Sequence, residues 1–147
     1  MILSGKIFSG FLIGLLVLAN SSSIQNVCAQ GTSGVLERIG EIMLTENASA
    51  LTEWASNPVE IAVFGASRTY SLAQGRYVLE EFFDSVDVLS FSIEEYTESE
   101  KGLFVEGTII VSESRYPLRV YLRLKLSVDG WILREVIFEK KSNQIRD

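Results

Sequence analysis

Residues 118–128, LRVYLRLKLSV, decide how the rest of the chain is interpreted. Every even-numbered residue of this segment is aliphatic, and the residues between them are Arg, Tyr, Lys or Ser. Because successive side chains of a β-strand point to opposite faces of a sheet, this period of two predicts a strand with one buried and one solvated face. The fold must therefore place an apolar layer against one side of this strand.

Three neighbouring segments have the same period, so residues 118–128 belong to a predicted set of four strands. The other three are residues 86–96, 103–112 and 131–140. Residues 98–102, residues 113–117 and Asp129-Gly130 separate the four, and the last of these is a strong signal for a two-residue hairpin turn. Short turns between consecutive strands predict an antiparallel meander.

The last of these strands is apolar on both faces. Ile132, Val136 and Phe138 alternate with a second apolar set, Trp131, Leu133 and Ile137. Such a strand must be covered on both sides, either by curling of its own sheet or by another subunit.

The N-terminal part of the domain predicts two helices and a short strand. The first helix has apolar residues at the helical period. Asn47 predicts the N-cap of a second, shorter helix, which Pro58 ends. Residues 59–65 then alternate as a strand. The apolar residues of the two helices are Val35, Leu36, Ile39, Ile42 and Met43 in the first, and Leu51, Trp54 and Ala55 in the second.

A capping box formed by Ser71 and Gln74 predicts the start of a third helix. Gly75 lies inside this helix and costs about 1 kcal/mol of helix stability relative to Ala. Either sequence drift or the close approach of another backbone explains a glycine at this position. We expect the apolar stripe of this helix to pack on the aliphatic face of residues 118–128, giving an α+β fold. The stripe consists of Leu72, Leu79, Phe82 and Phe83.

The first 29 residues predict a secretory signal peptide. Lys6 precedes an apolar run over residues 7–19 that is too short to span a bilayer, and Val27-Cys28-Ala29 has the small-x-small pattern of a cleavage site. Cleavage after Ala29 leaves one domain, residues 30–147, although Ala19 offers an alternative site. Because no small residue directly precedes Cys28, we expect export without lipidation, to a periplasm or beyond, and no membrane segment in the mature protein.

The mature chain is acidic. It keeps all 19 Asp and Glu residues and loses only Lys6 of the 13 Lys and Arg residues, so its net charge is −7. Because phosphate binding needs clustered cations, we expect neither nucleic acid nor an anionic membrane as a partner.

The chain contains no histidine, which excludes Ser-His-Asp and Cys-His catalysis and histidine metal sites. The acidic stretch around Glu94 lacks the Asp and Asn ligands of an EF-hand, so we predict no metal and no cofactor. Acid–base chemistry would then depend on a strand glutamate, Glu106 or Glu60, with Tyr77 or Tyr96 as proton donor.

Five short motifs, in order along the chain, carry a resemblance to a known superfamily. They are Asn47-Ala48 with Leu51 and Trp54, Val59-Glu60-Ile61, Tyr70-Ser71 with Ala73-Gln74, Arg119-Val120-Tyr121-Leu122 and Val136-Ile137-Phe138-Glu139. Over residues 34–141 the chain resembles the nuclear-transport-factor-2-like (SnoaL-like) superfamily, and within it a family of small exported bacterial domains of unknown function. The resemblance implies three helices packed on a strongly bent antiparallel meander, forming a cone with an internal pocket.

The superfamily includes isomerases, dehydratases and cyclases as well as pocket domains without activity, and its enzymes commonly place a His or Asp inside the cone. This chain has no His and no Asp that falls obviously on the inner face. We therefore predict no catalytic residue and a non-catalytic module whose cone binds a small apolar molecule or a partner segment. The alternatives are a carboxylate-based isomerase or dehydratase, and an interaction module, such as a homodimer, with a filled cone.

The expected pocket residues are Trp54, Phe83, Glu106 and Arg134. If the face with Ile132, Val136 and Phe138 lines the cone, Arg134 points inward and needs either Glu106 or an anionic ligand, because a buried unpaired charge costs several kcal/mol. In the alternative, Trp131, Leu133 and Ile137 face inward and Arg134 lies in water.

Overall fold

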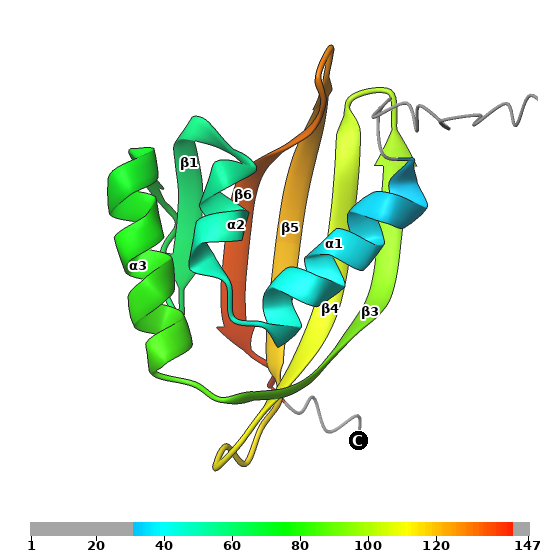
Figure 1. Ribbon diagram of the computed structural model, residues 1–147. Coiled ribbons are helices and arrows are strands. Elements are labelled where there is room, and N and C mark those ends of the chain that lie inside the picture. The colour runs from blue at the N-terminus through cyan, green and yellow to red at the C-terminus, as the bar shows by residue number, and fades with distance from the viewer. Residues whose placement is uncertain (1–30, 143–147) are drawn as a thin grey trace, which may run out of the picture.

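The computed structural model describes residues 31–142, and the predicted signal peptide lies outside them. Within this range the chain forms three helices and six strands (Figure 1). The helices are α1 (Thr32–Leu44), α2 (Ala48–Glu53) and α3 (Leu72–Asp84). The strands are β1 (Ala55–Val63), β2 (Arg68–Tyr70), β3 (Val88–Ser99), β4 (Gly102–Val111), β5 (Leu118–Ser127) and β6 (Gly130–Lys140).

All six strands form one sheet in the order β2-β1-β6-β5-β4-β3. The predicted meander is confirmed as β3 to β6, which pair antiparallel in chain order. The whole sheet is larger than this meander and is mixed, because β1 pairs with β6 in parallel and with the short β2 antiparallel. Strand β2 was not predicted, since its three residues are too few to show a period.

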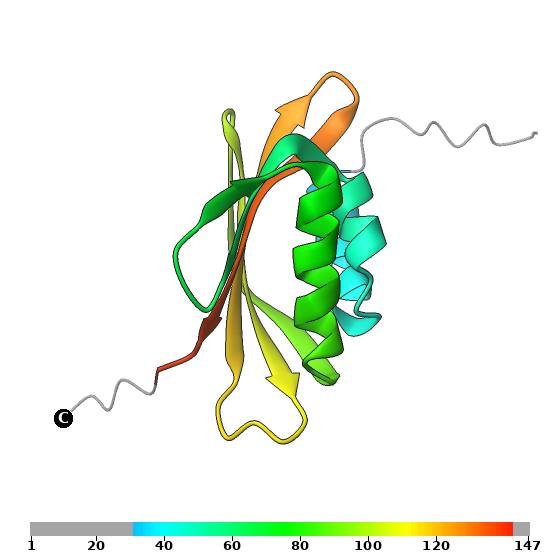
Figure 2. The same ribbon diagram turned by 90° about the vertical axis from the view of Figure 1, so that its left-hand side faces the viewer.

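The helices all lie on one face of the bent sheet, which we call the inner face (Figure 2). In Figure 1, α1 crosses the side of the sheet formed by β3 and β4, and α3 stands beside β1. No described helix covers the opposite face, which we call the outer face. The α+β cone architecture expected from the sequence is therefore present.

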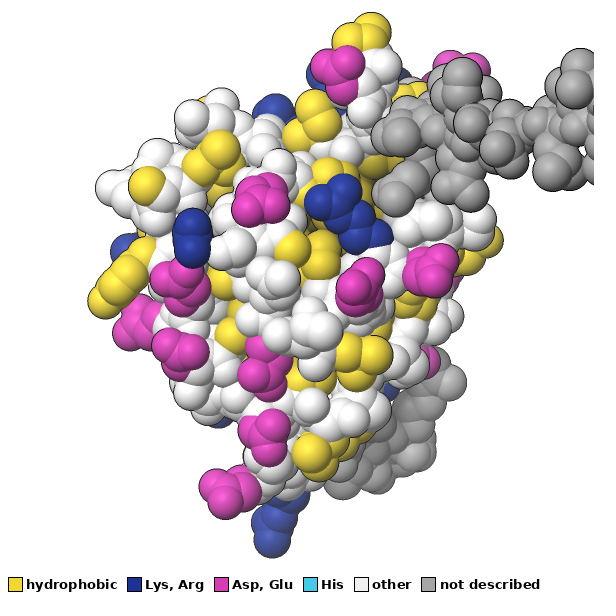
Figure 3. Space-filling model, viewed as in Figure 1, with side chains coloured by type: hydrophobic (Ala, Val, Ile, Leu, Met, Phe, Trp, Pro, Cys, Tyr) yellow, Lys and Arg dark blue, Asp and Glu magenta, His cyan; other side chains and the backbone are white. Residues whose placement is uncertain are grey.

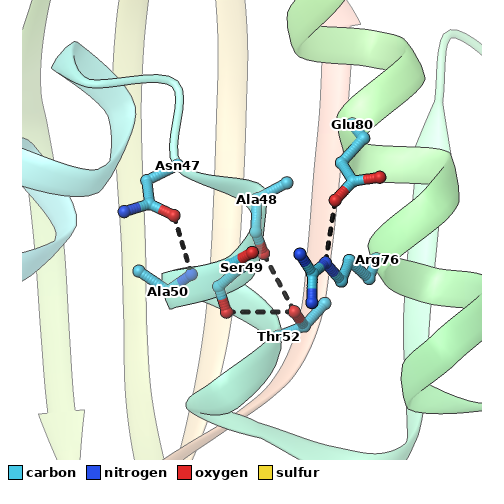
Figure 4. Close-up of polar contacts among 7 residues, drawn as sticks. All are labelled: Asn47, Ala48, Ser49, Ala50, Thr52, Arg76 and Glu80. Atoms are coloured by element: carbon cyan, nitrogen blue, oxygen red, sulfur yellow. Dashed lines mark hydrogen bonds and ion pairs between the residues drawn. The ribbon is translucent and has the colours of Figure 1, made fainter.

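The helix caps agree with the sequence signals. Asn47 accepts a hydrogen bond from the Ala50 amide at 3.0 Å (Figure 4), and Ser71 and Gln74 form both bonds of the capping box. The predicted role of Pro58 is wrong, because α2 already ends at Glu53 and Pro58 lies inside β1. The Trp54 carbonyl accepts a hydrogen bond from the Leu133 amide at 3.0 Å. The chain therefore hydrogen-bonds to β6 directly after α2 ends.

The aliphatic face of β5 is buried from Leu118 to Leu124, but its main neighbours differ from our expectation. Helix α3 lies mainly on α2 and β1 rather than on β5. It also reaches β6, where Phe82 stacks on Phe138 with ring centroids 4.0 Å apart. The reason is the sheet order: β1 and β6 separate the α3 side of the sheet from β5.

A β-bulge in β6 changes which of its residues face the core. Leu124 pairs with Leu133 and Arg123 pairs with Glu135, so Arg134 is an extra residue without a partner on β5. The alternation shifts by one at this point. Trp131 and Leu133 are buried before the bulge, and Val136 and Phe138 are buried after it. The prediction of two uninterrupted faces was therefore wrong for this strand.

The hairpin between β5 and β6 is present, but its turn lies one residue earlier than predicted. Ser127 pairs with Gly130, so Val128 and Asp129 form the turn. Gly130 follows it with φ of 112°, a conformation that is strained for residues with a Cβ.

Side chains fill the space between the helices and the sheet. A residue with zero exposure borders neither solvent nor an internal hollow large enough for water. Ile39, Met43 and Leu51 of the helices reach 0%, as do Leu103, Ile109, Val120, Leu133, Val136 and Phe138 of the sheet. The cone is packed at these residues, and the expected internal pocket is not formed there.

Candidate binding face

The structure does not gather the four predicted pocket residues in one cavity. Trp54 and Phe83 belong to the buried core, with 8% and 3% of their surface exposed. Glu106 lies on the outer face, where it alternates with the buried Val105 of the same strand. Arg134 is exposed at the bulge of β6.

The two hypotheses that placed Arg134 inside the cone are wrong. The bulge turns this residue to the solvent, and Glu106 pairs with Arg119 instead. The alternative is confirmed for Arg134, Trp131 and Leu133. It fails for Ile137, which follows the bulge and lies on the outer face beside Tyr121.

The centre of the outer face has a row of cations between two rows of carboxylates. Arg119 and Arg123 extend from β5. The Arg119 Nε lies 3.1 Å from the Glu106 Oε1 on β4. The Arg123 Nε lies 3.0 Å from the Glu135 Oε2 on β6, and its Nη2 lies 3.6 Å from the Glu60 Oε2 on β1. These ion pairs join the four central strands across the sheet.

Tyr121 stands between the two arginines on β5 and is linked to the first. The Arg119 Nη1 donates a hydrogen bond to the Tyr121 hydroxyl at 3.1 Å. This hydrogen bond raises the pKa of Arg119, and the nearby Glu106 and Glu139 carboxylates add to the effect, so the guanidinium stays charged. The buried Arg119 Nε makes its ion pair without an aligned hydrogen bond.

An apolar depression of about 430 Å³ lies among these charges, and we call it the outer-face depression. Phe104 contributes the most exposed apolar side chain, with 52% of its surface accessible, and Tyr121 and Ile137 are half-buried. Glu106, Arg123 and Glu135 also line it. Strands β3 to β6 therefore build one patch with an apolar floor and paired ions around it.

A second hollow, of about 550 Å³, lies near the hairpin between β5 and β6. Trp54, Trp131, Ile132, Lys125 and Arg134 are among the residues that line it. Two of the predicted pocket residues, Trp54 and Arg134, thus meet here, although Trp54 exposes little of its surface.

The residues named for a carboxylate enzyme are in different surroundings. Glu60 and Glu106 are both ion-paired to arginine, and Tyr77 is 67% exposed on α3, on the other side of the sheet. Tyr96 is exposed, and it lines the outer-face depression together with Glu106.

Within residues 31–142, no three acidic, histidine or cysteine side chains are grouped so that they could hold a metal ion. No helix in that range is long and apolar enough to cross a membrane.

Sequence reasoning missed Arg119, Arg123 and Glu135 as members of the site. The signal was present as the Arg-x-Tyr-x-Arg repeat on the polar face of residues 118–128. Its meaning depends on the register between β5 and β6, which places each arginine next to a glutamate.

The helices packed on one face of the bent sheet form an α+β fold of the nuclear-transport-factor-2-like kind. A family model described as a domain of unknown function, DUF4783, matches residues 36–139, and the chain belongs to this family. No functionally curated protein matches it.

Solved structures agree with this fold. A DUF4783 protein from Bacteroides uniformis superposes with a TM-score of 0.67 at 16% identity, covering 74% of this chain and 99% of that one. Another from Bacteroides ovatus gives a TM-score of 0.65 at 17% identity, with 71% and 94% covered. An NTF2-like protein of unknown function from Silicibacter pomeroyi gives 0.54 at 11% identity, with 74% and 92% covered.

Proposed function

We propose that this protein is an exported, non-catalytic interaction module that binds a partner protein through the outer face of its sheet. The observation that carries the proposal is the contrast between the two faces. Zero-exposure side chains pack the inner face, whereas the outer face keeps Phe104, Tyr121 and Ile137 accessible beside the outer-face depression.

The composition of this face favours a protein partner over a small molecule. Small-molecule sites enclose most of the ligand, while the outer-face depression is open to solvent on a sheet face that no described helix covers. Protein interfaces are enriched in aromatic residues and arginine around an apolar centre. Here Phe104 and Tyr121 lie with Arg119 and Arg123 on adjacent strands. Because both arginines are already paired with carboxylates, an approaching protein would not meet isolated charges.

Site-specific photo-crosslinking in the producing cell tests the proposal. A photoreactive phenylalanine analogue at position 104 should give a discrete crosslinked species, because this side chain projects from the outer face. The same analogue at position 77, on α3, is the control and should give none, since Tyr77 is even more exposed but on the helix side. Mass spectrometry of the same material should show a mature N-terminus near Gln30.

Equal crosslinking from both positions, or none from position 104, would refute the outer face as the binding site. An N-terminus at Met1 in the exported fraction would refute signal cleavage.

A further inference from the structure

We propose that the partner protein adds an extended, basic segment to the free edge of β3, as a seventh strand of the sheet. This inference rests on the proposed function, because β3 borders the outer-face depression through Glu95, Tyr96 and Thr97. It adds the mode of recognition, which is main-chain pairing at a sheet edge. It also adds the chemistry of the segment, which carries a Lys or Arg beside Glu95.

The two edges of the sheet differ in length. The strand order begins with β2 and ends with β3, so each of these has a neighbouring strand on one side only (Figure 1). Strand β2 has three residues, whereas β3 has 12 residues and no proline. Short strands and prolines are among the features that protect a sheet edge from pairing with another chain. Of the two edges, β3 is therefore the one that can accept a strand.

The regular part of this edge is residues 95–99. Strand β3 has one extra residue at Leu89 and another at Glu94, where its register against β4 shifts. Residues 95–99 then pair one to one with β4, and all five are exposed. Within residues 31–142, their backbone groups pair with the backbone of no element other than β4. Since five residues are the length of an ordinary strand, this edge is long enough to hold one.

The charges on the outer face change sign from strand to strand up to β4, and β3 breaks this order. Carboxylates of β6 lie opposite the arginines of β5, and Arg119 of β5 pairs in turn with Glu106 of β4. Glu95 of β3 lies directly opposite Glu106, so two carboxylates are neighbours on one face. Glu95 has no ion pair among the described residues. A cation on an added strand, about 4.8 Å beyond β3, would restore the alternation.

The surrounding charge also favours a basic segment. Glu94 and Glu98 lie on β3 and Glu100 lies in the turn after it, and all three are exposed. The chain has a net charge of −6, and acidic side chains are spread over the helix-bearing face as well (Figure 3). This field attracts a basic segment to the protein. The same charge opposes pairing of β3 with the β3 of a second copy, because glutamates would then meet across the new edge.

Amide hydrogen exchange with two synthetic peptides tests the strand pairing. In the first peptide lysine alternates with valine. The second has the same side chains but a methyl group on every amide nitrogen, so it keeps the charge and has no main-chain donor. At saturation the first peptide should slow the exchange of the outward-pointing amides of residues 95–99 at least about tenfold, because an added strand accepts their hydrogen bonds. The second should leave their exchange unchanged.

Glu95→Lys tests the place of the cation. This variant should bind the lysine–valine peptide about tenfold more weakly than the wild type, because a cation of the peptide then meets a cation of β3. Glu81→Lys is the matched control, since it makes the same charge change at an exposed residue of α3, on the helix side. Its affinity for the peptide should change less than about twofold, because salt screens a distant charge.

Unchanged exchange of residues 95–99 with the lysine–valine peptide, or equal protection by the N-methylated peptide, would overturn strand addition. Equal losses of affinity in the two variants would overturn the placement of the cation beside Glu95. The proposed function fails separately. A crosslink from position 104 without protection of β3 would keep the outer face and refute the edge, whereas protection of β3 without that crosslink would keep the edge and refute the outer face.

Discussion

At the scale of single residues, Gly75 shows how closely α3 approaches the sheet. A Cβ at this position would lie 3.0 Å from the Val59 Cγ1 and 3.1 Å from the Ile61 Cδ1, both on β1. The sequence left two explanations for this glycine open, sequence drift and the close approach of another backbone, and the structure shows a close approach of side chains instead. Val59 and Ile61 are almost completely buried, so neither can move away easily.

We expect Gly75→Ala to destabilise the protein by about 1 kcal/mol, because overpacking outweighs the gain in helix propensity. Gly40→Ala in α1 is the control. Its new Cβ meets only the Phe91 Cδ1 at 4.0 Å, so this variant should be more stable than the wild type by up to about 1 kcal/mol. Urea denaturation measures both, and a stabilising Gly75→Ala would show that β1 yields to the helix.

At the scale of elements, Trp54 connects the end of α2 to β6. Its Nε1 donates a hydrogen bond to the Trp131 carbonyl at 2.6 Å. The Arg38 guanidinium of α1 lies 4.8 Å from the centroid of the Trp54 ring. One side chain therefore ties two helices to the parallel side of the sheet.

Trp54→Phe should cost about 1–3 kcal/mol of stability, since it keeps an aromatic ring but leaves the buried Trp131 carbonyl without its partner. Trp131→Phe is the matched control, because the carbonyl belongs to the main chain and the hydrogen bond survives. Thermal unfolding followed by circular dichroism compares the two. Equal losses would mean that the hydrogen bond adds nothing beyond ring packing.

At the scale of the whole molecule, side chains fill the interior of the cone. The binding site that we propose is therefore a surface and not an internal cavity. Phe138 of β6 is fully buried and contacts Phe82 and Phe83, with ring centroids 4.0 and 6.1 Å away. It lies where the α3 layer meets the middle of the sheet. An open pocket would require this cluster to move apart.

Phe138→Ala should lose about 3–5 kcal/mol, the cost of a cavity left in a packed core. Phe104→Ala, on the outer face, should change the stability of the isolated chain by less than about 1 kcal/mol. Because Phe138→Ala can fail to fold, Phe138→Leu provides an intermediate loss in the same denaturation experiment. A Phe138→Ala variant as stable as the wild type would contradict the packed interior.

Much of the local structure was predictable from the sequence. The caps at Asn47 and Ser71 and the period of residues 118–128 depend on neighbours in the chain, so their signals are contained in short segments. The candidate site was less predictable. Glu106 was correctly noticed as a polar interruption of a strand. Arg134 was offered as its partner only for the case that Arg134 points into the cone, whereas the structure pairs Glu106 with Arg119.

The sequence by itself determined the α+β class, the meander from β3 to β6 and the packed apolar stripes, because each depends on a repeat within one segment. Only the tertiary structure decided the parallel pairing of β1 with β6, the bulge at Arg134 and the alignment of Arg123 with Glu135. These features depend on hydrogen bonds between segments far apart in the chain. A shift of one residue in such a register moves a side chain to the opposite face of the sheet, and no periodicity within one segment records it.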